Sequence, residues 1–174
     1  MTIASAHIEE LRILMTSTTP ITGVAELYER HYETVFRAAL RITGNPADAE
    51  DVLQTVFVRV LARGGSVEDV ELPAAYFRRA AVNAAVDVLR RRELRAESAP
   101  DDRTLHPVQP QLLLKEQLRR AVATLDTDDA SLFLLRHVEG LSIEELAGMF
   151  EMEKNNVTVR LHRIRQRLQA EMER

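Results

Sequence analysis

The sequence predicts an all-α protein of two small helical domains joined by a flexible linker, with a helix-turn-helix in the C-terminal domain. Apolar residues recur at helical spacing along most of the chain, and no segment shows the strict alternation of a half-buried strand. Residues 97–110 contain three of the six prolines and almost no apolar pattern, which is typical of a linker.

The composition is that of a globular protein, with 45% hydrophobic and 29% charged residues among 174. Cysteine is absent, which excludes disulfides, thiolate metal sites and cysteine nucleophiles. No stretch is apolar enough to cross a membrane, and the N-terminus carries Glu9 and Glu10 where an export signal would be basic. We therefore expect a cytoplasmic protein with no membrane insertion and no cofactor or metal.

An N-terminal domain is predicted over residues 23–96, after a loose leader at 1–22. It should contain three helices that pack as one bundle through their apolar faces, over about 23–43, 46–62 and 73–95. Gly44 suits the C-terminal cap of the first helix, and Asn45 suits the N-cap of the second.

The C-terminal domain is predicted over residues 111–174, with four helices at about 111–125, 128–138, 142–150 and 154 to the end. Ser142 and Glu145 form a capping box at the start of the third of these helices. A short helix, a tight connection and a longer basic helix are the layout of a helix-turn-helix, whose second helix lies in the major groove of DNA.

The last helix is basic on one side although the whole chain has a net charge of −4. Residues 154–168 contain five basic side chains and no acid. Amides, hydroxyls and cations on this face predict DNA contacts, from Lys154, Asn155, Asn156, Thr158, Arg160, His162 and Arg163. A solvated amphipathic helix is the alternative interpretation. Glu151, in the connection, stands where such turns often have glycine.

Together the two domains resemble a minimal sigma factor of the extracytoplasmic-function (ECF) group. The resemblance covers about residues 24–95 and 111–172, and rests on the order and spacing of several runs. These are Leu27-Tyr28, Asn45 to Phe57, Tyr76 to Asp87, Leu125, Leu141 to Ala147, and Val157 to Leu168. Tyr76 stands where the family often has tryptophan, which preserves an aromatic side chain.

The resemblance implies that the protein binds core RNA polymerase and promoter DNA and directs transcription initiation. The second helix would dock on a coiled coil of the largest polymerase subunit, through Glu50, Asp51, Gln54 and Phe57. The alternative for the acids near the start of this helix, Asp48 included, is that they only favour the helix dipole.

The third helix and the loop before it, residues 64–72, would capture an unstacked base of the minus-ten element. The residues implied are a polar stripe of Arg79, Asn83, Asp87, Arg90 and Arg91, for which a solvated face is the alternative. The C-terminal domain would bind the minus-thirty-five element as duplex. A dedicated inhibitor, an anti-sigma factor, is a further partner that the family implies.

No enzymatic activity is expected, because the five histidines are scattered and the chain has no glycine-rich phosphate loop. Two other functions fit the same motifs. A helix-turn-helix regulator with a helical sensing or dimerising domain at its N-terminus would bind duplex DNA without polymerase. A sigma-like adaptor would bind polymerase without promoter activity, and the residues around Glu151 favour that interpretation.

Overall fold

A computed structural model describes residues 21–62, 73–98 and 110–173. These residues form helices and their connections, with no strand, which confirms the all-α prediction. The helices are α2 (Ile21–Thr43), α3 (Pro46–Ala62), α4 (Pro73–Ser98), α5 (Pro110–Ala123), α6 (Thr127–His137), α7 (Ile143–Met149) and α8 (Lys154–Met172). Most of the predicted leader and linker, and all of the predicted loop 64–72, lie outside the described residues. No helix in the described part is long and apolar enough to span a membrane.

The helix ends follow local capping chemistry. Gly44 has a positive φ of 69°, and its amide donates to the Leu40 carbonyl at 2.9 Å, which closes α2. The Asn45 side chain accepts a 2.8 Å hydrogen bond from the Ala47 amide and starts α3. The capping box predicted at Ser142 and Glu145 is present at the start of α7.

The N-terminal helices α2, α3 and α4 pack as a bundle around aromatic side chains. The Phe57 ring lies 4.8 Å from that of Tyr28 and 5.4 Å from that of Phe77, measured between centroids. His31 is buried in the same place and stacks on Phe77 at 4.4 Å. Aromatic contacts at these distances add to the stabilisation from burial.

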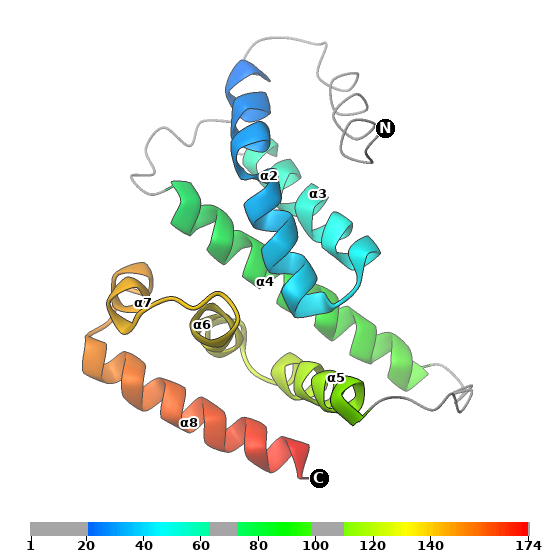
Figure 1. The fold of residues 1–174 in the computed structure, drawn as a ribbon, viewed down its shortest axis with the longest axis vertical. Coiled ribbons are helices and arrows are strands. Elements are labelled where there is room, and N and C mark those ends of the chain that lie inside the picture. Colours follow the sequence, from blue (N-terminus) through cyan, green and yellow to red (C-terminus); the bar gives the residue numbers. More distant parts are fainter. Residues whose placement is uncertain (1–20, 63–72, 99–109, 174) are drawn as a thin grey trace.

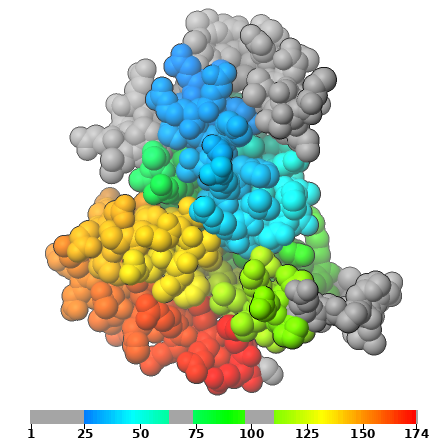
Figure 2. Space-filling model, in the orientation of Figure 1, coloured from blue at the N-terminus to red at the C-terminus, as the bar shows by residue number. Residues whose placement is uncertain are grey.

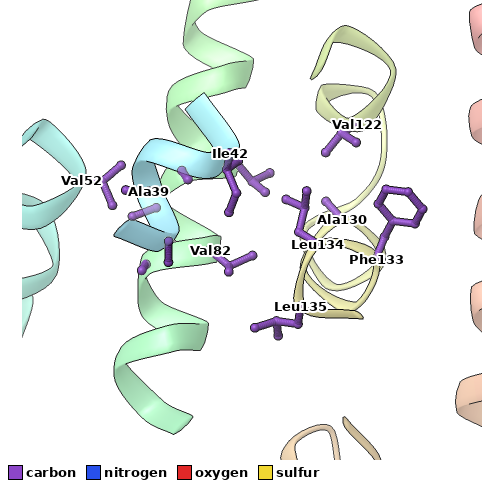
Figure 3. Packing of buried hydrophobic residues seen from close by; sticks show 14 of the residues in the cluster. Ala39, Ile42, Val52, Val82, Val122, Ala130, Phe133, Leu134 and Leu135 are labelled. Atoms are coloured by element: carbon purple, nitrogen blue, oxygen red, sulfur yellow. The ribbon is translucent and has the colours of Figure 1, made fainter. Parts of the chain in front are cut away.

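The two domains pack directly against each other (Figure 1). Helix α4 of the N-terminal domain lies at their interface, with α2 and α3 on one side and the C-terminal helices on the other. Its residues Phe77, Ala81 and Ala84 are buried, and so are Val82 and Val86. In Figure 3, Val82 on α4 and Ile42 on α2 lie opposite Leu134 and Leu135 of α6, within one continuous apolar core. The two domains pack together because both sides of α4 are apolar. The predicted linker therefore connects two domains that are in contact.

Figure 2 shows the same arrangement on the surface. The yellow atoms of α6 meet the blue atoms of α2. The predicted promoter-contacting helix α4 is thus covered on one side by its own bundle and on another by the C-terminal domain.

Candidate nucleic-acid interface

Helix α8 has one buried stripe and one polar face. Its buried residues Val157, Leu161, Ile164 and Leu168 attach it to the domain. Six of the seven side chains of this helix that were predicted to contact DNA are exposed, namely Lys154, Asn155, Asn156, Thr158, His162 and Arg163. The exposed face is therefore polar and cationic, as expected for an element that approaches phosphates and base edges.

Arg160, the seventh residue predicted on this face, turns toward α6. Its Nε donates to Asp129 at 2.6 Å, and Arg167 donates to the other carboxylate oxygen of Asp129 at 3.0 Å. The Asp129 side chain is only 11% exposed, so these charge-assisted bonds lie in a partly desolvated place. Asp129 and Arg167 were not among the predicted site residues. The acidic run that opens α6, opposite a basic helix, is the sequence signal that could have indicated them.

Asp126, the N-cap of α6, completes this cluster. Its carboxylate accepts a 2.9 Å hydrogen bond from the Asp129 amide and lies 3.7 Å from Arg160. Burial alone would raise the pKa of Asp126, but its bonds with Asp129 and the charges of Arg160 and Arg167 lower it below its usual value. The cluster fixes the orientation of α8 on α6.

The connection between α7 and α8 has the geometry that glycine usually provides. Glu151 has a positive φ of 52°. The Met152 amide donates to the Ala147 carbonyl at 2.9 Å, and the Glu151 amide donates to Gly148 at 3.4 Å. This is a Schellman motif with glutamate at the left-handed position, so the helix-turn-helix shape is kept at a cost in backbone strain.

The polar stripe on α4 divides into a covered part and an open part. Arg79, Asn83 and Arg90 contact the C-terminal domain. Arg79 donates to the Met149 carbonyl at 2.8 Å, and the Ser131 hydroxyl donates to the Asn83 side chain. Arg90 donates to the Leu125 carbonyl at 2.6 Å and to the Thr127 hydroxyl at 2.8 Å. Helical spacing in the sequence predicts that these three side chains share one face of α4, but it gives no sign that they contact the C-terminal domain.

Asp87 and Arg91 line the open part, a cleft of about 420 Å³ between α3 and α4, and Arg90 borders both parts because it also lines this cleft. Arg59 of α3 lines it too, with its Nη2 3.6 Å from the Asp87 carboxylate. Arg59 was not predicted as a site residue. Its spacing from Arg91 along the chain gives no signal that the two share a cleft, because their proximity depends on how α3 packs on α4.

The predicted polymerase-binding residues of α3 are not all on its surface. Asp51 and Gln54 are exposed, Glu50 is half-buried, and Phe57 is 2% exposed within the aromatic core. Phe57 therefore supports the helix from inside the bundle. Val58, which was not predicted, is 57% exposed and lies one turn after Gln54 on the same face.

Comparison with known proteins assigns both halves of the chain to sigma-factor regions. Residues 27–95 match the family model of Sigma-70 region 2, and residues 115–168 match that of Sigma-70 region 4. The structure of the sigma factor RpoE in complex with the anti-sigma factor NepR from Bartonella quintana is similar, with a TM-score of 0.49 and 20% identity over 84% of this chain and 94% of that one.

Two curated relatives are similar over most of this chain. The RNA polymerase sigma-E factor of Streptomyces coelicolor is 32% identical over 154 residues, which is 84% of this chain and 84% of the relative. The ECF RNA polymerase sigma factor SigE of Mycolicibacterium smegmatis is 32% identical over 155 residues, or 82% of this chain and 59% of that protein. The chain belongs to the ECF family of RNA polymerase sigma factors, and it binds core RNA polymerase and directs promoter recognition.

Proposed function

We propose that three surfaces divide the work of initiation: α3 docks on core polymerase, the cleft between α3 and α4 holds the opened minus-ten strand, and α8 reads duplex DNA upstream. The observation that carries this proposal is the open cationic cleft beside an exposed docking face on the same helix pair. Transcription initiation of this kind takes place where the polymerase is, in the cytoplasm.

The docking face consists of Asp51, Gln54 and Val58. These residues are spaced by three and four positions, so they lie along one side of α3, away from the core stripe of Val52, Val56 and Val60. An exposed valine beside polar residues is typical of a contact surface, because burying it against a partner removes apolar area from water. The half-buried Glu50 lies beside this face.

The cleft supports single-strand binding through its charge. Arg59 and Arg91 are cations on opposite walls, and both are exposed. Cations along a groove track the phosphates of a single strand, while an extruded base enters the groove. Asp87 accepts from base edges more readily than it approaches phosphates, and here it holds Arg59 in place.

Duplex contacts are assigned to the exposed residues of α8. Asn155, Asn156 and Thr158 lie at the N-terminal end of the helix, which is the end that reaches base edges in helix-turn-helix proteins. His162 and Arg163 lie one turn further on, where phosphate contact is expected. An anti-sigma factor is the further partner we propose, and it would hide the docking face and these cations.

Two pairs of substitutions test the division between docking and promoter opening. Asp51→Ala with Gln54→Ala should weaken binding to core polymerase. Arg59→Ala with Arg91→Ala should impair promoter opening and leave core binding intact, as should the milder Arg91→Ala alone. Arg92→Ala is the matched control, since this neighbouring arginine is exposed and does not line the cleft.

Core affinity can be measured by fluorescence anisotropy of labelled protein, and opening by permanganate reactivity of unpaired thymines. Equal loss of both activities in both double variants would contradict the division, because it would mean that the helices only support the fold.

A further inference from the structure

Helix α8 exposes an apolar side chain in the middle of its polar face. In this helix, all of which the structure describes, Val159 is the large apolar residue that stays open to solvent, with 41% of its surface exposed. At about 100° per residue, it lies nearly opposite the buried stripe that attaches α8 to its domain. Asn155 precedes it by four positions and Arg163 follows it by four, so the three side chains lie along the outward side of the helix.

A valine at this place costs the free protein stability. Its apolar surface remains in water, and its branched side chain suits the middle of a helix less well than alanine does. The first of these costs is recovered only when a partner covers the side chain. Val159 is therefore better explained by what α8 binds than by how α8 folds.

The surface beside Val159 is hollowed and combines apolar and cationic groups. A hollow of about 540 Å³ lies between α8 and the start of α7, and its walls include Ile143 and Leu161 as well as Val159. Arg136 and Arg165 line the same hollow, and none of the described residues around it is acidic. Apolar walls between cations suit an apolar group that is carried on a polyanion.

Thr158, which also lines the hollow, uses its hydroxyl hydrogen within the helix. The hydroxyl donates to the Lys154 carbonyl at 3.1 Å. The side chain can therefore meet a ligand through its methyl group or as an acceptor, but it has no hydrogen left to donate. Next to Val159 the hollow is thus suited to an apolar contact.

The major groove of DNA offers an apolar group at one base. Thymine presents its C5-methyl group there, among base edges that are otherwise hydrogen-bond donors and acceptors. We propose that Val159 and the hollow beside it receive the methyl group of a thymine in the upstream element, which makes Val159 a specificity-determining residue. This inference rests on the proposed function, because it names the base that the α8 surface reads. Arg136 and Arg165 supply the positive charge that attracts the flanking phosphates.

Deoxyuridine isolates this contact, because it pairs with adenine as thymine does and lacks only the methyl group. Burial of one such group against apolar atoms contributes about 0.8 kcal/mol, which corresponds to about a fourfold change in affinity. A single thymine in the upstream element should show this penalty when its methyl group is removed.

The test uses holoenzyme assembled from the full-length chain and core polymerase, on a promoter that run-off transcription identifies. Each thymine of the footprinted upstream element, on both strands, is replaced singly by deoxyuridine, and affinity is measured by competition with labelled promoter. One replacement should weaken binding about fourfold. Val159→Ala should weaken binding to the unmodified promoter and abolish this penalty, whereas Val159→Ile, which keeps a branched apolar side chain, should retain it.

Leu112→Ala is the matched control, because it shortens an apolar side chain of α5 that is 53% exposed and does not line the hollow. It should keep the deoxyuridine penalty, and circular dichroism checks that each variant is folded. The inference is overturned if no thymine responds, or if the penalty is the same in Val159→Ala as in the unmodified protein. Promoter-specific transcripts without any methyl effect reject the inference and leave the proposed function intact, whereas a holoenzyme that binds no promoter rejects both.

Discussion

Replacing Asp129 by asparagine should loosen the attachment of α8 to α6 while keeping the size and shape of the side chain. The carboxylate accepts bonds from Arg160 at 2.6 Å and from Arg167 at 3.0 Å, and it is only 11% exposed. Because the amide has no charge and its nitrogen cannot accept, at least one of the two bonds is lost and the other is weakened.

The magnitude follows from how well each partner is shielded from water. A hydrogen bond between charged groups contributes about 1.5–3 kcal/mol when it is protected. Arg160 is 34% exposed and keeps most of that value, whereas Arg167 is 56% exposed and its bond must be discounted for solvent screening. We expect the free energy of unfolding to fall by about 2–3 kcal/mol.

Urea unfolding, followed by far-ultraviolet circular dichroism, measures this loss of stability. The urea concentration at the midpoint should fall, while the slope of the free energy of unfolding against urea concentration stays the same. Glu144→Gln is the control, because it breaks an ion pair with Lys154 in which both side chains are more than 60% exposed. The stability lost in Glu144→Gln should be much smaller, since solvent-exposed ion pairs contribute little. If Asp129→Asn lost no more stability than Glu144→Gln, the buried cluster would not be what holds α8 in place.

Three further substitutions test backbone strain and protonation. Glu151→Gly should raise the melting temperature through a gain of about 0.5–1 kcal/mol, because φ is 52° there; no gain would refute the strain. Gly44→Ala should instead destabilise by about 1–2 kcal/mol or more, because φ is 69° and Arg119 fills the space; an unchanged melting temperature would argue against that contact. Burial lowers the pKa of His31 below 6.5, and the charge of Arg30 lowers it further, so the folded protein disfavours its protonation. Stability should be full above pH 6.5 and fall below it by at most about 1.4 kcal/mol per pH unit for this residue. His31→Phe should reduce the slope of urea midpoint against pH below 6.5, and an unchanged slope would mean that His31 is not the group titrating.

The helices could be predicted because their limits are set locally. Gly44 ends α2 through its own positive φ, and Ser142 starts α7 through bonds to residues three positions away. Signals of this kind need only a few neighbouring residues, so they can be recognised without knowing the tertiary structure. The exposed face of α8 could be predicted for the same reason, since helical periodicity separates it from the buried stripe.

The packing between the domains could not be predicted in the same way, because it depends on two surfaces that meet only in three dimensions. One signal was present: α4 has apolar residues at Val82, Val86 and Leu89 in addition to the stripe that faces α2 and α3. A helix that is apolar on more than one side is buried on more than one side. That pattern indicates a second partner for α4, although it does not identify the partner as α6.

The predicted roles of Arg160 and Phe57 show a related limit. Both occupy positions that the sequence pattern allows on a binding surface, yet Arg160 turns to Asp129 and Phe57 packs among Tyr28 and Phe77. A helical wheel gives the direction of a residue to within about one side-chain width, so residues at the edge of a face can turn either way. Tertiary partners decide these positions.

Run-off transcription tests the central claim most directly: purified chain and core polymerase are incubated with a library of promoter fragments, and transcripts are sequenced from their start sites. We expect defined start sites that share upstream and minus-ten motifs and that appear only when both proteins are present. Tight duplex binding by the chain alone with no transcripts, or polymerase binding with no transcripts on any promoter, would contradict the account.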